Sequence, residues 1–200
     1  MASTGRKTTS TKRPTRARQP RKTAQPGVVS RMVESVTNIF TSSEEKQTNA
    51  IDLLTADHRK VQDLFDRVRD NEGEGRRTLP EIRRELELHT HIEEQIFYPH
   101  LLKVGDEKLQ SITREALEEH RQVKVVLDDI ETTSNDSDDF AAKLKVLMED
   151  VEHHVEEEEG EMFPLVRGKV DEEMLVRLGT LMEGEKKRVK DGSSLAASAR

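Results

Sequence analysis

The spacing of the apolar residues most strongly limits what this chain can fold into. From about Ile51 to Lys190, apolar side chains recur every three or four positions, and the alternation typical of β-strands is absent. This period matches the 3.6-residue turn of an α-helix. We therefore expect an all-α protein.

Turn-forming residues divide this region into five expected helices. Two glycines mark a loop at 71–75, and Pro99 and Pro164 are expected to end the helices that precede them. Short connections between long helices favour antiparallel neighbours, so the first four helices predict an up-down-up-down bundle. The second helix is expected to begin near Pro80. The five helices are expected at about 50–69, 80–98, 106–131, 137 or 138–163 and 171–190.

The fifth helix is predicted as an additional C-terminal helix beside the bundle. Its apolar residues recur at helical spacing, so they form one packing face. The residues of this face are Met174, Leu175, Leu178, Leu181 and Met182.

The apolar stripe of each bundle helix is interrupted by histidine or glutamate. An ionised carboxylate buried without a partner costs several kcal/mol or takes up a proton. A metal cation would explain why such residues occupy inward positions. These residues are His58, His89, Glu93, His120, His154 and Glu158.

An internal repeat relates these residues. His58-Arg-Lys-Val resembles His120-Arg-Gln-Val 62 residues later, and a His-x-x-x-Glu-Glu motif recurs with an offset of 65. Both copies of that motif run into an aromatic residue followed by proline. Residues four apart lie on one helix face. Each half therefore contributes two histidines and a glutamate, which predicts a dinuclear metal site.

A single inward histidine is more often a hydrogen-bonded core residue than a ligand, but six residues in matching registers favour metal binding. Of the other histidines, His91 and His153 fall out of phase, and His100 returns to the side of His89 but lies beyond Pro99. All three are expected at the surface, with His91 or His153 as the alternative ligand in a different helical register. The neighbours of Glu158 in the run 156–159 are expected to face solvent. Tyr98 is also out of phase, so no redox role is expected for it.

The absence of cysteine limits the chemistry of the predicted site. It excludes disulfides, thiolate zinc sites, iron–sulfur clusters and cysteine nucleophiles. Imidazole and carboxylate ligands suit iron, manganese, zinc or cobalt. The Glu-x-x-His pairs of ferritin-like sites and the His-Glu-x-x-His motif of zinc peptidases are also absent.

The paired motifs, together with Asp57-His58 and Glu119-His120, resemble those of the hemerythrin-like HHE cation-binding domains over about 50–167. This resemblance implies an antiparallel four-helix bundle around a non-haem di-iron centre, in which oxo or hydroxo and carboxylate groups bridge two iron ions. It also implies that the six inward residues are the iron ligands, with Glu93 and Glu158 as the bridges.

The chain departs from the oxygen-carrying hemerythrins that it resembles at two positions. Lys124 stands where they have a further histidine, and Glu158 stands where they have aspartate. These differences favour peroxide or NO chemistry, or sensing, over reversible O2 carriage. We also expect Lys124 to place a cation beside a bound anion.

Two classes of function follow from this resemblance and from the predicted site. The first is a di-iron protein that binds or reacts with O2, hydrogen peroxide or NO, with peroxidase-like or catalase-like turnover left open. The second is a metal-dependent module that senses iron or oxygen without turnover, and iron buffering is a weaker variant of it. In both classes, metal binding should stabilise the fold.

The N-terminal region has a different composition. Residues 1–31 carry nine basic residues and no acidic residue, and residues 1–27 are predicted to be a disordered arm. The arm is expected to contact nucleic acid or anionic surfaces, to be a solvated tail, or to be an organelle transit peptide. No apolar run is long enough to span a membrane, so a cytoplasmic protein is expected. The predicted organisation is 1–27 arm, 28–49 short amphipathic helix and linker, 50–167 bundle, 168–190 C-terminal helix and 191–200 flexible tail.

Overall fold

The structure is a computed structural model that describes residues 48–71, 73–134 and 138–192. The predicted arm, the amphipathic helix at 28–40 and the end of the predicted tail lie outside the described residues. Within the three described ranges the regular elements are all helical, which confirms the predicted all-α class.

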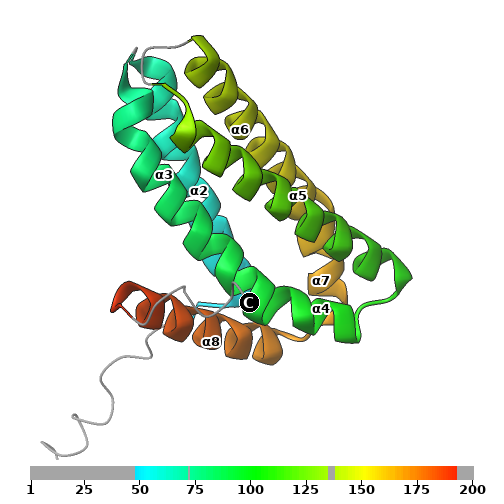
Figure 1. Cartoon of the computed structure of the whole chain (residues 1–200). Coiled ribbons are helices and arrows are strands. Elements are labelled where there is room, and N and C mark those ends of the chain that lie inside the picture. The colour runs from blue at the N-terminus through cyan, green and yellow to red at the C-terminus, as the bar shows by residue number, and fades with distance from the viewer. Residues whose placement is uncertain (1–47, 72, 135–137, 193–200) are drawn as a thin grey trace, which may run out of the picture. The chain divides into compact units, whose positions relative to one another are not determined.

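Four long helices form an antiparallel bundle (Figure 1). Helix α2 (Ala50–Asp70) packs along α3 (Glu74–Ile92), and α5 (Glu107–Thr132) packs along α6 (Asp138–Glu157). Figure 1 shows these two pairs side by side. The predicted bundle is therefore confirmed, and each half of the internal repeat provides one helix pair.

The helices that carry Pro99 and Pro164 do not end at these prolines. A π-helical turn follows both α3 and α6, and a further α-helical segment begins after each turn. Each proline lies in the first turn of the new segment, where its missing amide hydrogen costs no helical hydrogen bond. The prediction that the prolines end their helices is therefore wrong. The added segments are η1 (Glu93–Phe97), α4 (Tyr98–Val104), η2 (Glu158–Met162) and α7 (Phe163–Lys169).

Helix α3 begins before Pro80, which corrects the predicted start of the second helix. Gly75 lies inside this helix because α6 approaches it closely: an added Cβ would lie 2.7 Å from Leu144 Cδ2. The guanidinium of Arg76 lies 3.9 Å from the centre of the Phe140 ring. These contacts with α6 stabilise a helical segment that the glycine pattern alone predicts to be a loop.

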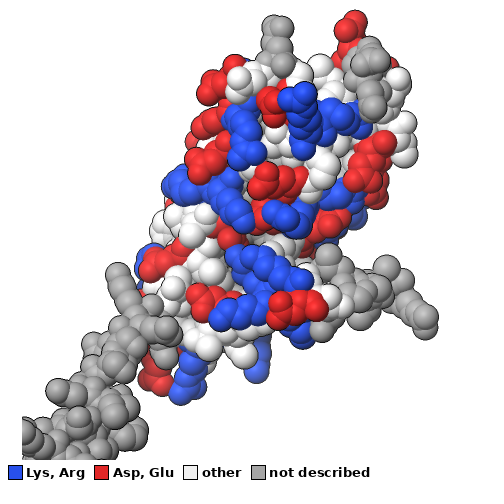
Figure 2. All heavy atoms as spheres, turned by 90° about the vertical axis from the view of Figure 1, so that its left-hand side faces the viewer, with Lys and Arg blue, Asp and Glu red and all other residues white. Residues whose placement is uncertain are grey.

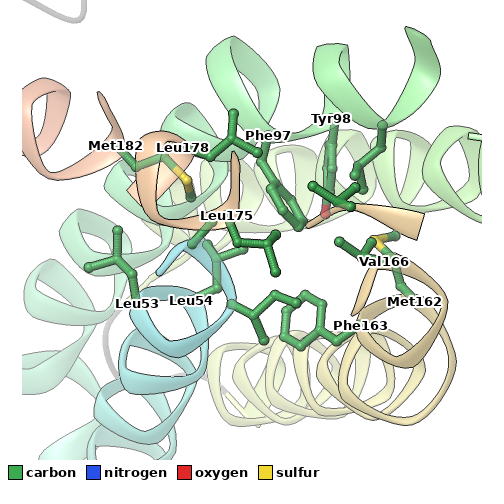
Figure 3. Close-up of a cluster of buried hydrophobic side chains, with 14 of the residues drawn as sticks. Leu53, Leu54, Phe97, Tyr98, Met162, Phe163, Val166, Leu175, Leu178 and Met182 are labelled. Atoms are coloured by element: carbon green, nitrogen blue, oxygen red, sulfur yellow. The ribbon is translucent and has the colours of Figure 1, made fainter. Parts of the chain in front are cut away.

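Two apolar clusters fill the bundle on either side of the predicted metal ligands. Along each helix, the inward histidine lies between a residue of one cluster and a residue of the other. The first cluster lies at the end of the bundle that α8 covers, and Figure 3 shows part of it. It includes Leu54, Phe97, Tyr98, Met162 and Phe163, whereas the second includes Val61, Phe65, Ile82, Leu127 and Leu147.

Helix α8 (Glu172–Lys190) lies across one end of the bundle and contacts α2, α3 and η1 (Figure 1). Gly179 allows a close approach, since an added Cβ would overlap the carbonyl oxygen of Thr48. The predicted packing face is wrong at Leu181, which is 60% exposed. The residues of this helix that enter the first apolar cluster are Leu175, Leu178 and Met182, as Figure 3 shows.

Acidic and basic side chains alternate over the face shown in Figure 2. That face therefore has no single large region of positive charge. None of the described helices is long and apolar enough to cross a membrane.

Candidate metal centre

Four buried histidines form two pairs in the middle of the bundle. The ring centroids of His58 from α2 and His89 from α3 lie 4.8 Å apart. Those of His120 from α5 and His154 from α6 lie 4.7 Å apart. Each half of the sequence repeat thus supplies one imidazole pair.

The carboxylate of Glu93 contacts one imidazole from each pair. Its Oε2 atom lies 3.1 Å from Nε2 of His89 and 3.3 Å from Nε2 of His120. Glu93 is the first residue of the π-helical turn η1, and its side chain is fully buried. It therefore lies between the two halves rather than within one of them.

Glu158 occupies the corresponding place in the second half. Its Oε2 atom lies 3.2 Å from Nε2 of His58 and 3.6 Å from Nε2 of His154. Glu158 is the first residue of η2 and is also buried. The structure thus brings all six predicted residues into one site, and both carboxylates contact both imidazole pairs.

Burial and mutual charge strongly perturb this site. Burial and the charge of Glu158 raise the pKa of Glu93 well above its ordinary value. Burial acts in the same direction on Glu158, but His154 and His58 outweigh it and lower the pKa of that carboxyl. Burial lowers the pKa of His89 to about 4. Added positive charge at the centre would therefore stabilise both carboxylates in their ionised forms.

The chemistry of the donor atoms fits a metal. Buried polar atoms almost always have a hydrogen-bond partner, yet six atoms in this part of the described structure have none. Imidazole nitrogen and carboxylate oxygen are common ligands of divalent first-row metals. Two overlapping groups of ligand atoms each fall within 4.8 Å and are able to hold an ion. The unpartnered atoms are His58 Nε2, His89 Nδ1 and Nε2, Glu93 Oε1 and Oε2, and Glu158 Oε2.

The other ring nitrogen, Nδ1, of each histidine faces a carboxylate, which sequence reasoning did not assign to the site. Such a partner fixes the orientation and tautomer of a ligand histidine. Two of these carboxylates directly precede a ligand histidine and two directly follow a buried glutamate, so the repeat itself carried the signal. The distances from Nδ1 are His154 to Glu119 2.7 Å, His58 to Glu159 2.9 Å, His120 to Glu94 3.1 Å and His89 to Asp57 3.7 Å.

Three of these four outer carboxylates bind a basic side chain. Lys124 donates to Glu94, so its ammonium group is paired with this carboxylate. The expectation that Lys124 also places a cation beside a bound anion stays a prediction. Glu159 is not simply solvated, which corrects its predicted role. The contacts are Arg59 Nη2 to Glu159 at 2.7 Å, Lys124 Nζ to Glu94 at 2.6 and 2.8 Å, and Lys186 Nζ to Asp57 at 2.5 and 2.7 Å.

Tyr98 lies inside the site, although its helical phase predicts that it points away. The π-helical turn before it adds a residue to the helix and so changes the direction of every later side chain. The Tyr98 hydroxyl donates to Glu158 Oε1 at 2.7 Å, and its ring lies 5.3 Å from that of His120. Burial and the charge of Glu158 raise the pKa of Tyr98.

The three histidines that were predicted at the surface differ from one another. His153 is exposed, as predicted. His100 is half-buried. His91 is largely buried, and its Nε2 atom lies 2.7 Å from Glu185 of α8, so its predicted surface position is wrong. The sequence pattern of the second helix could not indicate that α8 covers this position.

The fold and the site together define a helical bundle that encloses a buried cluster of histidine and glutamate able to hold a metal ion. The chain belongs to the Hemerythrin HHE cation binding domain family, whose model matches residues 49–166. The predicted resemblance is therefore confirmed. Helix α8 follows the matched region.

The chain is also similar to proteins of known sequence or structure. An uncharacterized hemerythrin-like protein of Schizosaccharomyces pombe is 27% identical over 146 residues, which cover 72% of each chain. A DNA nickase of Nostoc is 24% identical over 149 residues, and the match covers 74% of this chain but only 42% of the nickase. The crystal structure of a hemerythrin HHE cation-binding domain-containing protein from Mycobacterium kansasii has a TM-score of 0.62 and 25% identity, and the match covers 76% of this chain and 95% of that chain.

Proposed function

We propose that the six inward residues hold two iron ions and that the protein binds or reacts with O2, hydrogen peroxide or NO at this centre. One observation carries the proposal: each of two buried carboxylates contacts an imidazole from both halves of the bundle. A carboxylate in this position suits a bridge between two ions. The ligands are His58, His89, Glu93, His120, His154 and Glu158, with the two glutamates as bridges.

Bound iron would supply redox chemistry and coordination positions for a small oxidant or NO. The chain would control access to it, because the apolar clusters on both sides limit the entrance of water. The outer carboxylates would hold the four imidazoles in a fixed orientation. The Tyr98 hydroxyl, at 2.7 Å from Glu158 Oε1, would keep a proton beside one of the bridging carboxylates.

The alternative is a sensing or buffering module that binds the same metal without turnover. Because the proposed ligands come from four helices, metal binding would stabilise the whole bundle under both functions. Steady-state consumption of hydrogen peroxide, followed at equal iron content, separates the two functions. Turnover supports a reaction at the centre, whereas a spectral change without turnover supports ligand binding or sensing.

The first test is the iron content of protein reconstituted without oxygen, together with its optical spectrum before and after addition of O2, hydrogen peroxide or NO. We expect about two iron ions per chain and a spectrum that changes with at least one of these reagents. His89→Ala and His154→Ala should each lose the bound iron. Fully folded protein that binds no iron, or a single zinc ion only, would contradict the proposal.

We also propose that the basic N-terminal segment binds nucleic acid. Its nine lysines and arginines within residues 1–31, without an acidic residue, favour contact with phosphates. The face shown in Figure 2 has alternating acidic and basic side chains and therefore no comparable concentration of positive charge. The similarity to a protein named DNA nickase supports this proposal but extends over only 42% of that relative.

Binding of a short DNA duplex to the full chain and to a chain that lacks residues 1–31 tests this second proposal. The full chain should bind more tightly, and its affinity should fall steeply as salt increases. Equal affinity of the two chains would overturn it.

A further inference from the structure

One outer carboxylate lacks the basic partner that the other three have. Within the described part of the chain, Glu119 is paired with His154 and with no lysine or arginine. Its counterpart in the repeat, Asp57, binds the ammonium group of Lys186 with both oxygens. The two halves therefore differ in whether a cation neutralises this carboxylate.

The positions beside these two carboxylates differ in the same way. In the first half, Leu88 and Ile92 are buried where α8 covers α3. The repeat offset of 65 places His153 and Glu157 at the corresponding positions of the second half. His153 is exposed and Glu157 is about half-exposed. The place that α8 and its lysine fill in one half is thus open to solvent in the other, where a histidine and a glutamate line it.

We propose that Glu119, His153 and Glu157 form an outer site for a divalent first-row metal ion. One ligand atom from each residue lies within 4.8 Å of the others. His153 and Glu157 are four residues apart on one helix, so they face the same side, and Glu119 approaches from α5. A set of one imidazole and two carboxylates suits Fe²⁺, Mn²⁺, Zn²⁺ or Co²⁺.

The surface beside these residues has room for the remaining ligands of such an ion. Glu119 and His153 line a hollow of about 140 Å³ with Gln122, Val123 and Asp150. Because a water molecule occupies about 30 Å³ of the liquid, the hollow holds several waters. Asp150 adds a further negative charge near the ion, although its carboxylate already accepts a hydrogen bond from Gln122.

An ion at this site would act on the buried centre through Glu119. The Nδ1 atom of His154 lies 2.7 Å from Glu119, where no basic residue is present among the described residues. The Nδ1 atom of His89 lies 3.7 Å from Asp57, which binds Lys186. A cation that binds Glu119 should likewise draw the carboxylate away from His154 and weaken this hydrogen bond. The outer site would thereby change the donor strength of a ligand histidine.

Zinc binding to the iron-loaded full chain tests the outer site. We expect one additional Zn²⁺ per chain, measured by atomic emission after equilibrium dialysis, while the iron content stays constant. His153→Ala and Glu157→Gln should each weaken this binding by at least about tenfold. Glu156→Gln, at an exposed position next to Glu157, is the matched control and should bind zinc as the wild type does. Zinc should also shift the optical spectrum of the iron centre in the wild type but not in the His153 variant.

The proposal is overturned if the wild type binds no additional zinc ion. It is also overturned if the wild type and the His153→Ala, Glu157→Gln double variant bind zinc equally. The proposed function can fail separately. If the protein takes up no iron, the wild type should still bind one zinc ion more than the double variant. A zinc ion that binds without shifting the iron spectrum would remove the coupling to His154.

Discussion

The two halves of the bundle hold equivalent histidine and glutamate residues in unequal surroundings. Tyr98 comes from the first half of the repeat but lies in the second half of the bundle, where its ring is beside His120 and its hydroxyl donates to Glu158. Its equivalent in the repeat, Phe163, lies in the first half of the bundle, where it stacks on His58 at 5.9 Å and has no hydroxyl to donate. The halves therefore share the imidazoles and carboxylates that face the centre and differ in the layer of residues around them.

The second difference comes from α8, which follows the region that the family model matches. Its Lys186 binds Asp57, the carboxylate that faces Nδ1 of His89. Glu119, the carboxylate that faces Nδ1 of His154, has no such lysine among the described residues. Burial lowers the pKa of His89 to about 4. The pKa of His154 is raised, because Glu158 and Glu119 outweigh the effect of its burial. The sequence repeat thus determines which atoms face the centre, while non-repeated residues such as Lys186 determine the surroundings of the outer carboxylates.

Substitution of a shared carboxylate should have the largest effect, because it removes a contact from both halves. In Glu158→Gln, and separately in Glu93→Gln, we expect the affinity for both metal ions to fall on the order of 100-fold. Anaerobic titration with Fe²⁺ or Co²⁺ measures the loss. Glu161→Gln is the control, since Glu161 is exposed in the same π-helical turn as Glu158. Loss of only one ion would show that the halves bind metal independently.

Removal of the lysine should make the first half resemble the second. In Lys186→Gln, Asp57 keeps its buried position without its ammonium partner, so the free energy of unfolding should fall by about 3 kcal/mol. The released carboxylate should move toward His89 and raise the pKa of that histidine in the metal-free protein. Urea unfolding and NMR titration of the histidines measure these changes. The exposed Lys187→Gln should change neither quantity.

The same substitution also changes how stability depends on pH. Since the pKa of His89 is lowered in the fold, the unfolded chain takes up its proton first, and stability is lost as pH falls from about 6.5 to 4. A higher pKa of His89 in Lys186→Gln should make this loss smaller. An unchanged histidine titration would show that Lys186 does not control the position of Asp57.

Tyr98→Phe should make the second half resemble the first. The variant loses a hydrogen bond to a buried carboxylate, which should cost about 2 kcal/mol in the metal-free protein. The pKa of Glu158 should rise because its Oε1 atom loses a donor. Urea unfolding of the metal-free protein measures the cost. A variant as stable as the wild type would mean that the hydroxyl contributes nothing to the site.

Phe163→Tyr is the reciprocal change and should have the smallest effect. By the symmetry of the halves, the new hydroxyl should reach Glu93, whose Oε1 atom is buried without a hydrogen-bond partner among the described residues. We expect the metal-free protein to gain about 1 kcal/mol and the pKa of Glu93 to fall. Urea unfolding gives the first quantity. Destabilisation relative to the wild type would show that the two aromatic positions are not equivalent.

The sequence predicts the fold and the inward residues because both depend on local periodicity. His89 and His154 precede the π-helical turns that follow their helices, and α2 and α5, which carry His58 and His120, are α-helical throughout. An unbroken 3.6-residue period therefore gives the direction of all four histidines correctly. Tyr98 follows such a turn, and its direction is mispredicted for that reason.

Contacts between distant segments could not be predicted in the same way. Lys186 and Asp57 are 129 residues apart, and no repeat or periodic pattern relates them. His91 also depends on α8 for its partner Glu185. The sequence did contain a signal for Glu94 and Glu159, because both copies of the motif have a second glutamate directly after the first. Glu94 follows Glu93 in one copy, and Glu159 follows Glu158 in the other. Their roles become clear only when each is seen to contact a histidine of the opposite half.

The most direct test of the central claim is the number of metal ions that bind per chain. Anaerobic Fe²⁺ titration measures this number in the wild type, in Glu93→Gln and in Glu158→Gln. If the carboxylates join the two imidazole pairs into one centre, the wild type binds two ions per chain and each variant loses both together. A wild type that binds one ion, or variants that each lose a single ion and keep the other at full affinity, would contradict a shared dinuclear centre.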